Sequence, residues 1–187
     1  MLNGTMYNYL KDALKSIKGD YLEIGVFDGE GLAMIANNFP EKIIYGVDPF
    51  MEDGNTTHIT SISRDNKLDF IEKQARYNTL PYRNACLFVM TSKEFGQFYP
   101  KVTNAFDDIS AVFIDGSHWY DDVTYDYHLA VSIINGKKGI VAFDDLLIPD
   151  VNKAYNEFLT IYKDIIEKVI NVHVDNGLSY MSAVYIN

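Results

Sequence analysis

The sequence contains only one cysteine, one tryptophan and five prolines. Cys86 has no partner for an intrachain disulfide, and its apolar neighbours predict a buried thiol. No apolar run approaches the roughly 20 residues that a membrane helix needs. The N-terminus also lacks the basic and apolar regions of a signal peptide. We therefore expect a soluble, cytoplasmic protein.

Positive charge is also scarce. The chain has 16 Lys and Arg against 26 Asp and Glu, which leaves a formal net charge of −10. Such a surface repels nucleic acid and anionic membranes, so neither is expected as a partner. The 187 residues, 48% of them hydrophobic and 22% charged, have the length and composition of one globular domain spanning residues 1–187.

Strand and helix patterns alternate along the chain. Short apolar runs predict buried strands at 21–24, 42–47, 86–90, 111–114 and 139–143. Helical spacing occurs at 7–17 (within an N-terminal segment 1–19), 32–36, 65–77, 121–134 and 151–162. The runs 165–174 and 179–186 flank an Asn-Gly pair, which predicts a hairpin. We expect an α/β, Rossmann-like three-layer sandwich with a mostly parallel sheet and an antiparallel C-terminal hairpin.

A glycine-rich turn follows the first predicted strand, with glycines at 25, 29 and 31. Glycine allows positive φ and lets a ligand approach the backbone. Asp48 ends the second predicted strand, about 20 residues beyond this turn, where a ribose-binding carboxylate is found in nucleotide-binding sheets. Together these features predict a site for a cofactor that contains a nucleoside.

The glycine spacing distinguishes between two cofactors. The dinucleotide fingerprint is G-x-G-x-x-G, whereas here Gly25 and Gly29 are separated by three residues and Glu23 precedes them. An acid beside a pyrophosphate is repulsive, but it suits a cationic ligand. S-adenosylmethionine carries a sulfonium and an ammonium group and has no phosphate, so it is favoured. An NAD-dependent oxidoreductase is the alternative.

The segment E-I-G-x-x-x-G from Glu23 to Gly29, with Asp48 and the terminal hairpin, resembles class I S-adenosylmethionine-dependent methyltransferases over nearly the whole chain. The resemblance implies that the turn holds the methionine part of the cofactor and that Asp48 holds the ribose. It also implies that Thr91 and Ser92 approach the adenine, although a serine there is also a common helix N-cap. The residues predicted to contact the cofactor are Glu23, Gly25, Phe27, Gly29, Asp48, Ser92 and Asp115.

Carboxylates follow two further strands. Asp115 ends the fourth predicted strand, and Asp144 and Asp145 end the fifth. Parallel strands open on the same edge, so the three side chains are expected to converge, and they repel one another unless a cation neutralises them. Oxygen ligands without cysteine favour Mg²⁺, Mn²⁺ or Ca²⁺. The sequence therefore predicts a site for a divalent metal ion, and Mg²⁺ is the ion expected there.

The same motifs resemble the metal-dependent O-methyltransferases, namely the catechol type and the group of macrolide-sugar O-methyltransferases and cephalosporin hydroxylase proteins. This resemblance implies that Asp115, Asp144 and Asp145 hold the metal, and that Asp115 takes part in catalysis. In the catechol-type enzymes a basic residue at the offset of His118 from Asp115 removes the proton of the acceptor hydroxyl, so the resemblance implies that His118 is the candidate general base. It is also placed to bind the metal or an acceptor hydroxyl. The other histidines, at 58, 128 and 173, are expected to have no catalytic role.

The acceptor is predicted through this resemblance alone as a small hydroxylated molecule, a sugar or a secondary metabolite. The aromatic residues near the motifs are read either as an acceptor pocket or as core, and they are Phe27, Trp119, Tyr120, Tyr125 and Tyr127. The segment 51–64 is either a lid or an insertion. We also expect a homo-oligomer in which a second subunit completes the pocket for the acceptor. An alternative function is a non-catalytic binding module with a methyltransferase-like fold.

Overall fold

The structure is a computed structural model that describes residues 4–51, 64–99, 109–174 and 179–187. Its strands are β1 (Asp20–Ile24), β2 (Ile44–Val47), β3 (Ala85–Phe88), β4 (Ile109–Ile114), β5 (Gly139–Phe143), β6 (Ile166–Val174) and β7 (Ser179–Ile186). Its helices are α1 (Gly4–Leu14), α2 (Glu30–Asn38), α3 (Arg64–Thr79), α4 (Ser92–Phe98), α5 (Tyr120–Ile134) and α6 (Pro149–Ile161).

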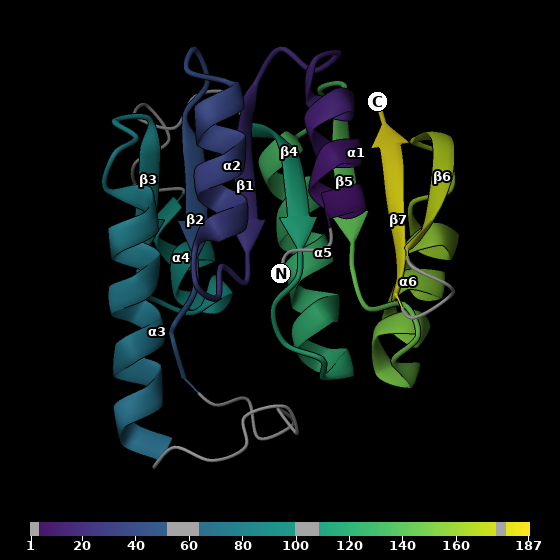
Figure 1. The fold of residues 1–187 in the computed structure, drawn as a ribbon. Coiled ribbons are helices and arrows are strands. Elements are labelled where there is room, and N and C mark those ends of the chain that lie inside the picture. Colours follow the sequence, from purple (N-terminus) through teal and green to yellow (C-terminus); the bar gives the residue numbers. More distant parts are fainter. Residues whose placement is uncertain (1–3, 52–63, 100–108, 175–178) are drawn as a thin grey trace.

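The strands form one twisted sheet in the order β3-β2-β1-β4-β5-β7-β6. Strands β1 to β5 are parallel, whereas β7 lies antiparallel to both β5 and β6. Figure 1 shows the arrowheads of β1, β2, β4 and β5 at the same edge of the sheet. The predicted fold class is confirmed. The strand order reverses between β1 and β4, and the carboxyl ends of strands at such a point commonly bind ligands.

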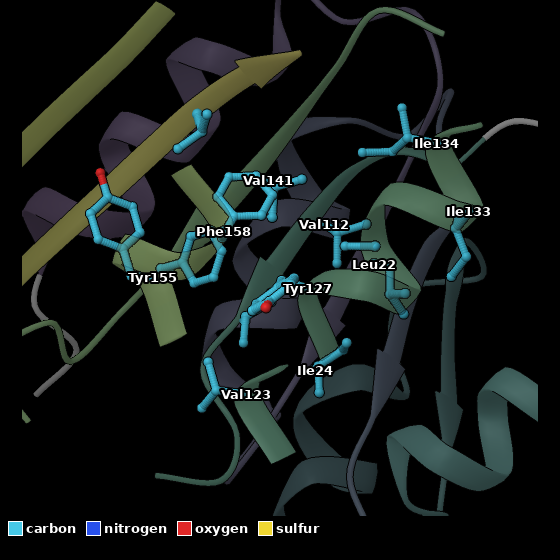
Figure 2. Packing of buried hydrophobic residues seen from close by; sticks show 14 of the residues in the cluster. Leu22, Ile24, Val112, Val123, Tyr127, Ile133, Ile134, Val141, Tyr155 and Phe158 are labelled. Atoms are coloured by element: carbon cyan, nitrogen blue, oxygen red, sulfur yellow. The ribbon is translucent and has the colours of Figure 1, made fainter. Parts of the chain in front are cut away.

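Helices cover both faces of the sheet, with α1, α2 and α3 on one side and α4, α5 and α6 on the other (Figure 1). Successive side chains of a strand point to opposite faces. Leu22 and Val112 therefore pack with Tyr127 of α5 and Phe158 of α6 (Figure 2), whereas Phe113 packs in a second cluster with residues of α1, α2 and α3. Burial on both faces explains why the central strands are mostly apolar, with the buried Glu23 of β1 as an exception.

Two helices differ from the prediction. The first ends at Leu14 instead of near residue 17, and α4 was not among the predicted elements. A seven-residue helix is too short for a periodic apolar pattern, but a capping box of Thr91 and Glu94 marks its start. None of the helices in the described ranges is long and apolar enough to cross a membrane.

Candidate functional site

The turn between β1 and α2 packs so closely against the turn after β4 that Gly25 has no room for a side chain. Gly25 has a φ of +91°, and a Cβ placed on it would lie 2.0 Å from the backbone oxygen of Asp115. Gly29, with a φ of +78°, is the N-cap of α2, and its Cβ would lie 2.9 Å from the Cα of Ala75 in α3. Backbone geometry therefore requires glycine at both positions.

Asp48 follows β2 and holds this turn in place. Its Oδ2 accepts the backbone N–H groups of Val26 at 2.8 Å and Phe27 at 3.0 Å, and its Oδ1 accepts the N–H of Phe50 at 2.6 Å. Phe27 and Phe50 each have a φ of +50°, which is unfavourable for a residue with a side chain. The carboxylate therefore stabilises two strained residues that border the predicted site.

We expect Asp48→Asn to lower the free energy of unfolding by about 2 kcal/mol, because an amide nitrogen cannot accept the N–H groups that one carboxylate oxygen now accepts. Urea denaturation measures this change. The matched control is Asp28→Asn in the same turn, where the carboxylate accepts one N–H, from Glu30 at 3.1 Å. The control substitution should lower the free energy of unfolding by less than about 1 kcal/mol. Equal losses in the two variants would contradict the role given to Asp48.

A cavity of about 580 Å³ opens beside the turn, at the carboxyl ends of β1, β2 and β4. This volume is typical of small-molecule and cofactor sites. The residues named in the sequence prediction that line it are Gly25, Phe27, Asp48, Thr91, Ser92, Asp115, His118 and Asp145. Glu23, Gly29 and Asp144 do not line it. The structure thus brings together most of the predicted site.

Glu23 lies behind the cavity wall. It is fully buried, and its two carboxylate oxygens accept hydrogen bonds from the hydroxyl groups of Tyr7 and Tyr21, each at 3.0 Å. Burial raises the pKa of Glu23 to about 8, although the two tyrosine hydrogen bonds oppose this shift. The expected contact between Glu23 and a cofactor is not provided by this arrangement, because the side chain points towards α1 and both oxygens are occupied. Tyr7, which does line the cavity, was not predicted as a site residue from the sequence.

Three aspartates lie at the ends of β4 and β5, as predicted. Burial, followed by the charges of Asp144 and Asp145, raises the pKa of Asp115 well above its ordinary value. Asp144 is buried, and its Oδ1 accepts the backbone N–H of Asp145 at 2.7 Å. Asp145 has a φ of +54°, and its Oδ2 lies 2.9 Å from Nε2 of His118.

The predicted divalent-metal site is not supported by this arrangement. Within the described ranges, no group of three or more His, Cys, Asp or Glu side chains is placed to hold a metal ion. The physical reason is that two of the three carboxylates have other partners, since Asp144 binds the backbone of the next residue and Asp145 binds His118. The residues present therefore do not fit the metal that the sequence predicted.

His118 is half-buried at the cavity and bonded to Asp145. This places the candidate general base at the site, with a carboxylate that orients its ring. His128 lies on α5, and its Nδ1 is 2.6 Å from the hydroxyl of Tyr162. His58 and most of the predicted lid segment 51–64 lie outside the described residues, and so does the side chain of His173.

Two acidic residues of α5 that line the cavity were not predicted from the sequence. Asp122 accepts hydrogen bonds from Lys93 at 2.7 Å and from Ser117 at 2.9 Å. Asp126, one turn further along the helix, is buried, and its Oδ1 has no hydrogen-bond partner. Both residues line the cavity. Their spacing of four residues, which places two acids on one face of a helix, was the available signal.

The aromatic residues divide between the core and the surface. Tyr127 is fully buried against Phe158, with ring centroids 5.5 Å apart, so it belongs to the core. The hydroxyl of Tyr120 donates a hydrogen bond to Glu157 of α6. Phe27 and Trp119 are 61% and 46% exposed. Of the five aromatic residues named from the sequence, only Phe27 lines the cavity.

Comparisons with known proteins agree with this geometry. A family described as Methyltransferase domain matches residues 22–146, which is more than half of the chain. An uncharacterized protein of Acanthamoeba polyphaga mimivirus is 27% identical over 144 residues, which cover 71% of this chain and 58% of that protein. The chain therefore spans little more than half the length of this relative.

Solved structures share the fold at low sequence identity. CalS11, a TDP-rhamnose 3'-O-methyltransferase of calicheamicin biosynthesis, matches with a TM-score of 0.63 and 14% identity over 97% of this chain and 77% of its own. The N-methyltransferase NodS from Bradyrhizobium japonicum, solved with S-adenosylhomocysteine, matches with a TM-score of 0.57 and 10% identity over 97% and 85% of the two chains.

Proposed function

Because the chain belongs to a family of methyltransferase domains, we propose that it transfers the methyl group of S-adenosylmethionine to a hydroxyl oxygen of a small molecule. The observation that carries this proposal is the cavity beside the glycine turn, whose lining residues other than Tyr7 lie within the matched residues 22–146. The NAD-dependent alternative has no such support, because the glycine spacing departs from the dinucleotide fingerprint.

The residues at the cavity fit a cationic, nucleoside-containing cofactor. The absence of a Cβ at Gly25 allows the turn to pack closely against Asp115, and Gly25 itself lines the cavity. Among the described residues of the lining, carboxylates outnumber cations: Lys93 is the one lysine, and the acids are Asp28, Asp48, Asp115, Asp122, Asp126 and Asp145. A cavity with this excess of negative charge attracts a sulfonium and an ammonium group.

The bound cofactor supplies an activated methyl group on a positively charged sulfur. Transfer of this methyl group to the acceptor oxygen would break the carbon–sulfur bond and leave S-adenosylhomocysteine and a methylated product. The protein contributes mainly by aligning the reacting atoms, because such positioning supplies much of the rate gain in a two-substrate reaction. The glycine turn, which Asp48 holds in place through the backbone N–H groups of Val26 and Phe27, positions one reactant at one end of the cavity.

The proton of the acceptor hydroxyl is assigned to His118. The imidazole tautomer in which Nε2–H donates to Asp145 carries its lone pair on Nδ1, and this nitrogen takes the proton during transfer. Asp145 then stabilises the imidazolium that results. No step of this mechanism requires a metal.

We expect His118→Gln to lower the turnover number about 100-fold or more, because it removes the general base. The affinity for S-adenosylhomocysteine should change little, since the substitution leaves the glycine turn and Asp48 intact. His128→Gln is the matched control, because this histidine is bonded to Tyr162 and does not line the cavity. A loss of turnover in the control equal to that in His118→Gln would contradict the assignment.

The proposed function is tested by two measurements on the intact protein. Titration calorimetry should detect binding of S-adenosylhomocysteine to the protein and no binding of NAD. Transfer of a radiolabelled methyl group is then measured with a panel of nucleotide sugars, free sugars and catechols, with and without Mg²⁺. The sugars are included because CalS11, a structural neighbour, acts on TDP-rhamnose. Cofactor binding without transfer to any hydroxylated acceptor would favour the non-catalytic binding module.

A further inference from the structure

A second cavity lies at the opposite edge of the sheet from the glycine turn. It has a volume of about 450 Å³, and it is lined by the C-terminal ends of α1 and α2 and by the segments that lead from these helices into β1 and β2. Figure 1 shows both helices ending where β1 and β2 begin, at the top of the view. The volume lies within the range of small-molecule sites.

The charge of this cavity is opposite to that of the whole protein. Glu41 is the one acid among the described residues of its lining, and the basic residues there are Lys11, Lys15, Lys18 and Lys42. Four of the chain's 16 basic residues thus surround one cavity, together with one of its 26 acidic residues. Lys15 also lies 2.7 Å from the carboxylate of Asp12. The lysines of this cavity therefore outnumber the two acids beside them, in a protein with a net charge of −10.

Lys42 holds one of these charges at a fixed place. The residue is buried, with 5% of its surface exposed, and its ammonium group donates hydrogen bonds to the carbonyl oxygens of Ile17 at 2.6 Å and Gly19 at 2.7 Å. A mobile surface lysine loses rotamer freedom when it binds a ligand, and this loss lowers the affinity. Because Lys42 is already ordered, its charge attracts an anion without that cost.

The other three lysines follow one another along α1 and the segment after it. Lys11 and Lys15 are four residues apart, a spacing at which like charges repel each other on a helix. A basic residue in the last turn of a helix also interacts favourably with the helix dipole, which accounts for Lys11 without a ligand. This explanation does not extend to Lys18, which follows the end of α1, or to Lys42, which lies between α2 and β2. The C-terminal ends of α1 and α2 each contribute about half a negative charge, which reduces the positive excess without reversing it.

We propose that this lysine cavity binds the phosphate group of a small phosphate monoester. Such a group carries close to two negative charges near neutral pH and has oxygens that accept charge-assisted hydrogen bonds from ammonium groups. The cavity is larger than a phosphate group, so it also has room for the molecule that carries the phosphate. A small ligand is favoured over an extended anionic surface, because the net charge of the protein repels such a surface over its whole area. The inference does not depend on the proposed function.

Titration calorimetry on the intact protein tests the site with inorganic phosphate and with glucose 1-phosphate, at mildly alkaline pH and constant ionic strength. Each should bind as one molecule per chain. In the double variant Lys11→Gln, Lys18→Gln the affinity for both ligands should fall at least about tenfold, because charge-assisted hydrogen bonds to the phosphate are lost. This variant keeps the buried Lys42 and its bonds to the backbone, and circular dichroism shows that it is folded.

The double variant Lys137→Gln, Lys138→Gln is the matched control. It removes the same charge between α5 and β5, and neither residue lines the cavity. Its affinity for both ligands should equal that of the unmodified protein. An equal loss in the two double variants would show a general attraction of anions to lysine and would overturn the site. An unchanged affinity in Lys11→Gln, Lys18→Gln, together with lower stability in urea, would also overturn it, because the lysines would then act only on the end of α1.

Two further measurements locate the ligand and identify its source. Glucose 1-phosphate should slow amide hydrogen exchange in α1 and in residues 38–42, whereas slower exchange at the glycine turn alone would place the anion in the other cavity and overturn the inference. Vesicles that contain phosphatidic acid present the same group on a membrane, and the protein should not sediment with them. Sedimentation with these vesicles without binding of glucose 1-phosphate would assign the lysines to a lipid headgroup and overturn the small ligand. If neither inorganic phosphate nor glucose 1-phosphate binds, the inference fails and the proposed methyl transfer is unaffected.

Discussion

Gly25→Ala will lower the free energy of unfolding by about 4 kcal/mol and abolish detectable binding of S-adenosylhomocysteine. The added Cβ would lie 2.0 Å from the backbone oxygen and 2.4 Å from the carbonyl carbon of Asp115, both far inside van der Waals contact. These are backbone atoms, so they cannot rotate away as a side chain can. The substitution also places an L-residue at a φ of +91°. Overpacking and backbone strain each cost about 1–3 kcal/mol.

The structure provides a control that separates these two causes. Gly136 also has a positive φ, of +71°, but a Cβ there would meet nothing within 4 Å. Gly136→Ala should therefore cost only about 1 kcal/mol, the cost of the backbone conformation alone. Urea denaturation of both variants measures the difference. If Gly25→Ala loses no more stability than Gly136→Ala, the close approach of the turn to Asp115 is not what requires glycine.

Glu23→Gln should stabilise the protein at alkaline pH relative to the unmodified chain. Burial raises the pKa of Glu23 from 4.5 to about 8 in the folded state. Between these values the folded protein holds a proton that the unfolded chain has lost, so the free energy of unfolding falls as the pH rises from about 4.5 to about 8. The difference in pKa corresponds to roughly 5 kcal/mol once the pH exceeds 8. Glutamine carries no charge and avoids this loss.

The measurement is urea denaturation of both proteins at pH 5, 6, 7, 8 and 9. The stability of Glu23→Gln minus that of the unmodified protein should rise across this range and level off above pH 8. Tyr7 and Tyr21 have pKa values well above 10, so they do not titrate in this window. Glu41→Gln changes an exposed glutamate and should give a curve parallel to that of the unmodified protein. A constant difference between Glu23→Gln and the unmodified protein would show that Glu23 is ionised at all these pH values.

Much of the site could be predicted because it depends on where strands end. The apolar runs place Asp48 after β2, Asp115 after β4 and Asp145 after β5, and parallel strands bring their carboxyl ends to one edge. The glycine turn was recognisable for a similar reason, because its constraint is local to the backbone. Each of these features could be identified from a short run of consecutive residues.

The groups that each carboxylate binds could not be predicted, because most of them are distant from it in the sequence. Glu23 was expected at the cofactor, but Tyr7 of α1 and Tyr21 occupy its oxygens. Asp145 was expected to hold a metal, but it binds His118. Asp126 was not singled out, because its burial depends on how α5 packs against the segment that contains Ser92.

The sequence by itself determined the alternation of strands and helices, the glycine turn and the line of acids along one edge of the sheet. These follow from apolar periodicity and backbone restrictions, which act over a few residues. Only the tertiary structure decided which acids face the cavity, which are paired and which oxygen remains without a donor. The physical reason is that desolvation and hydrogen bonding are properties of the packed neighbourhood, and this neighbourhood joins residues that lie far apart in the chain.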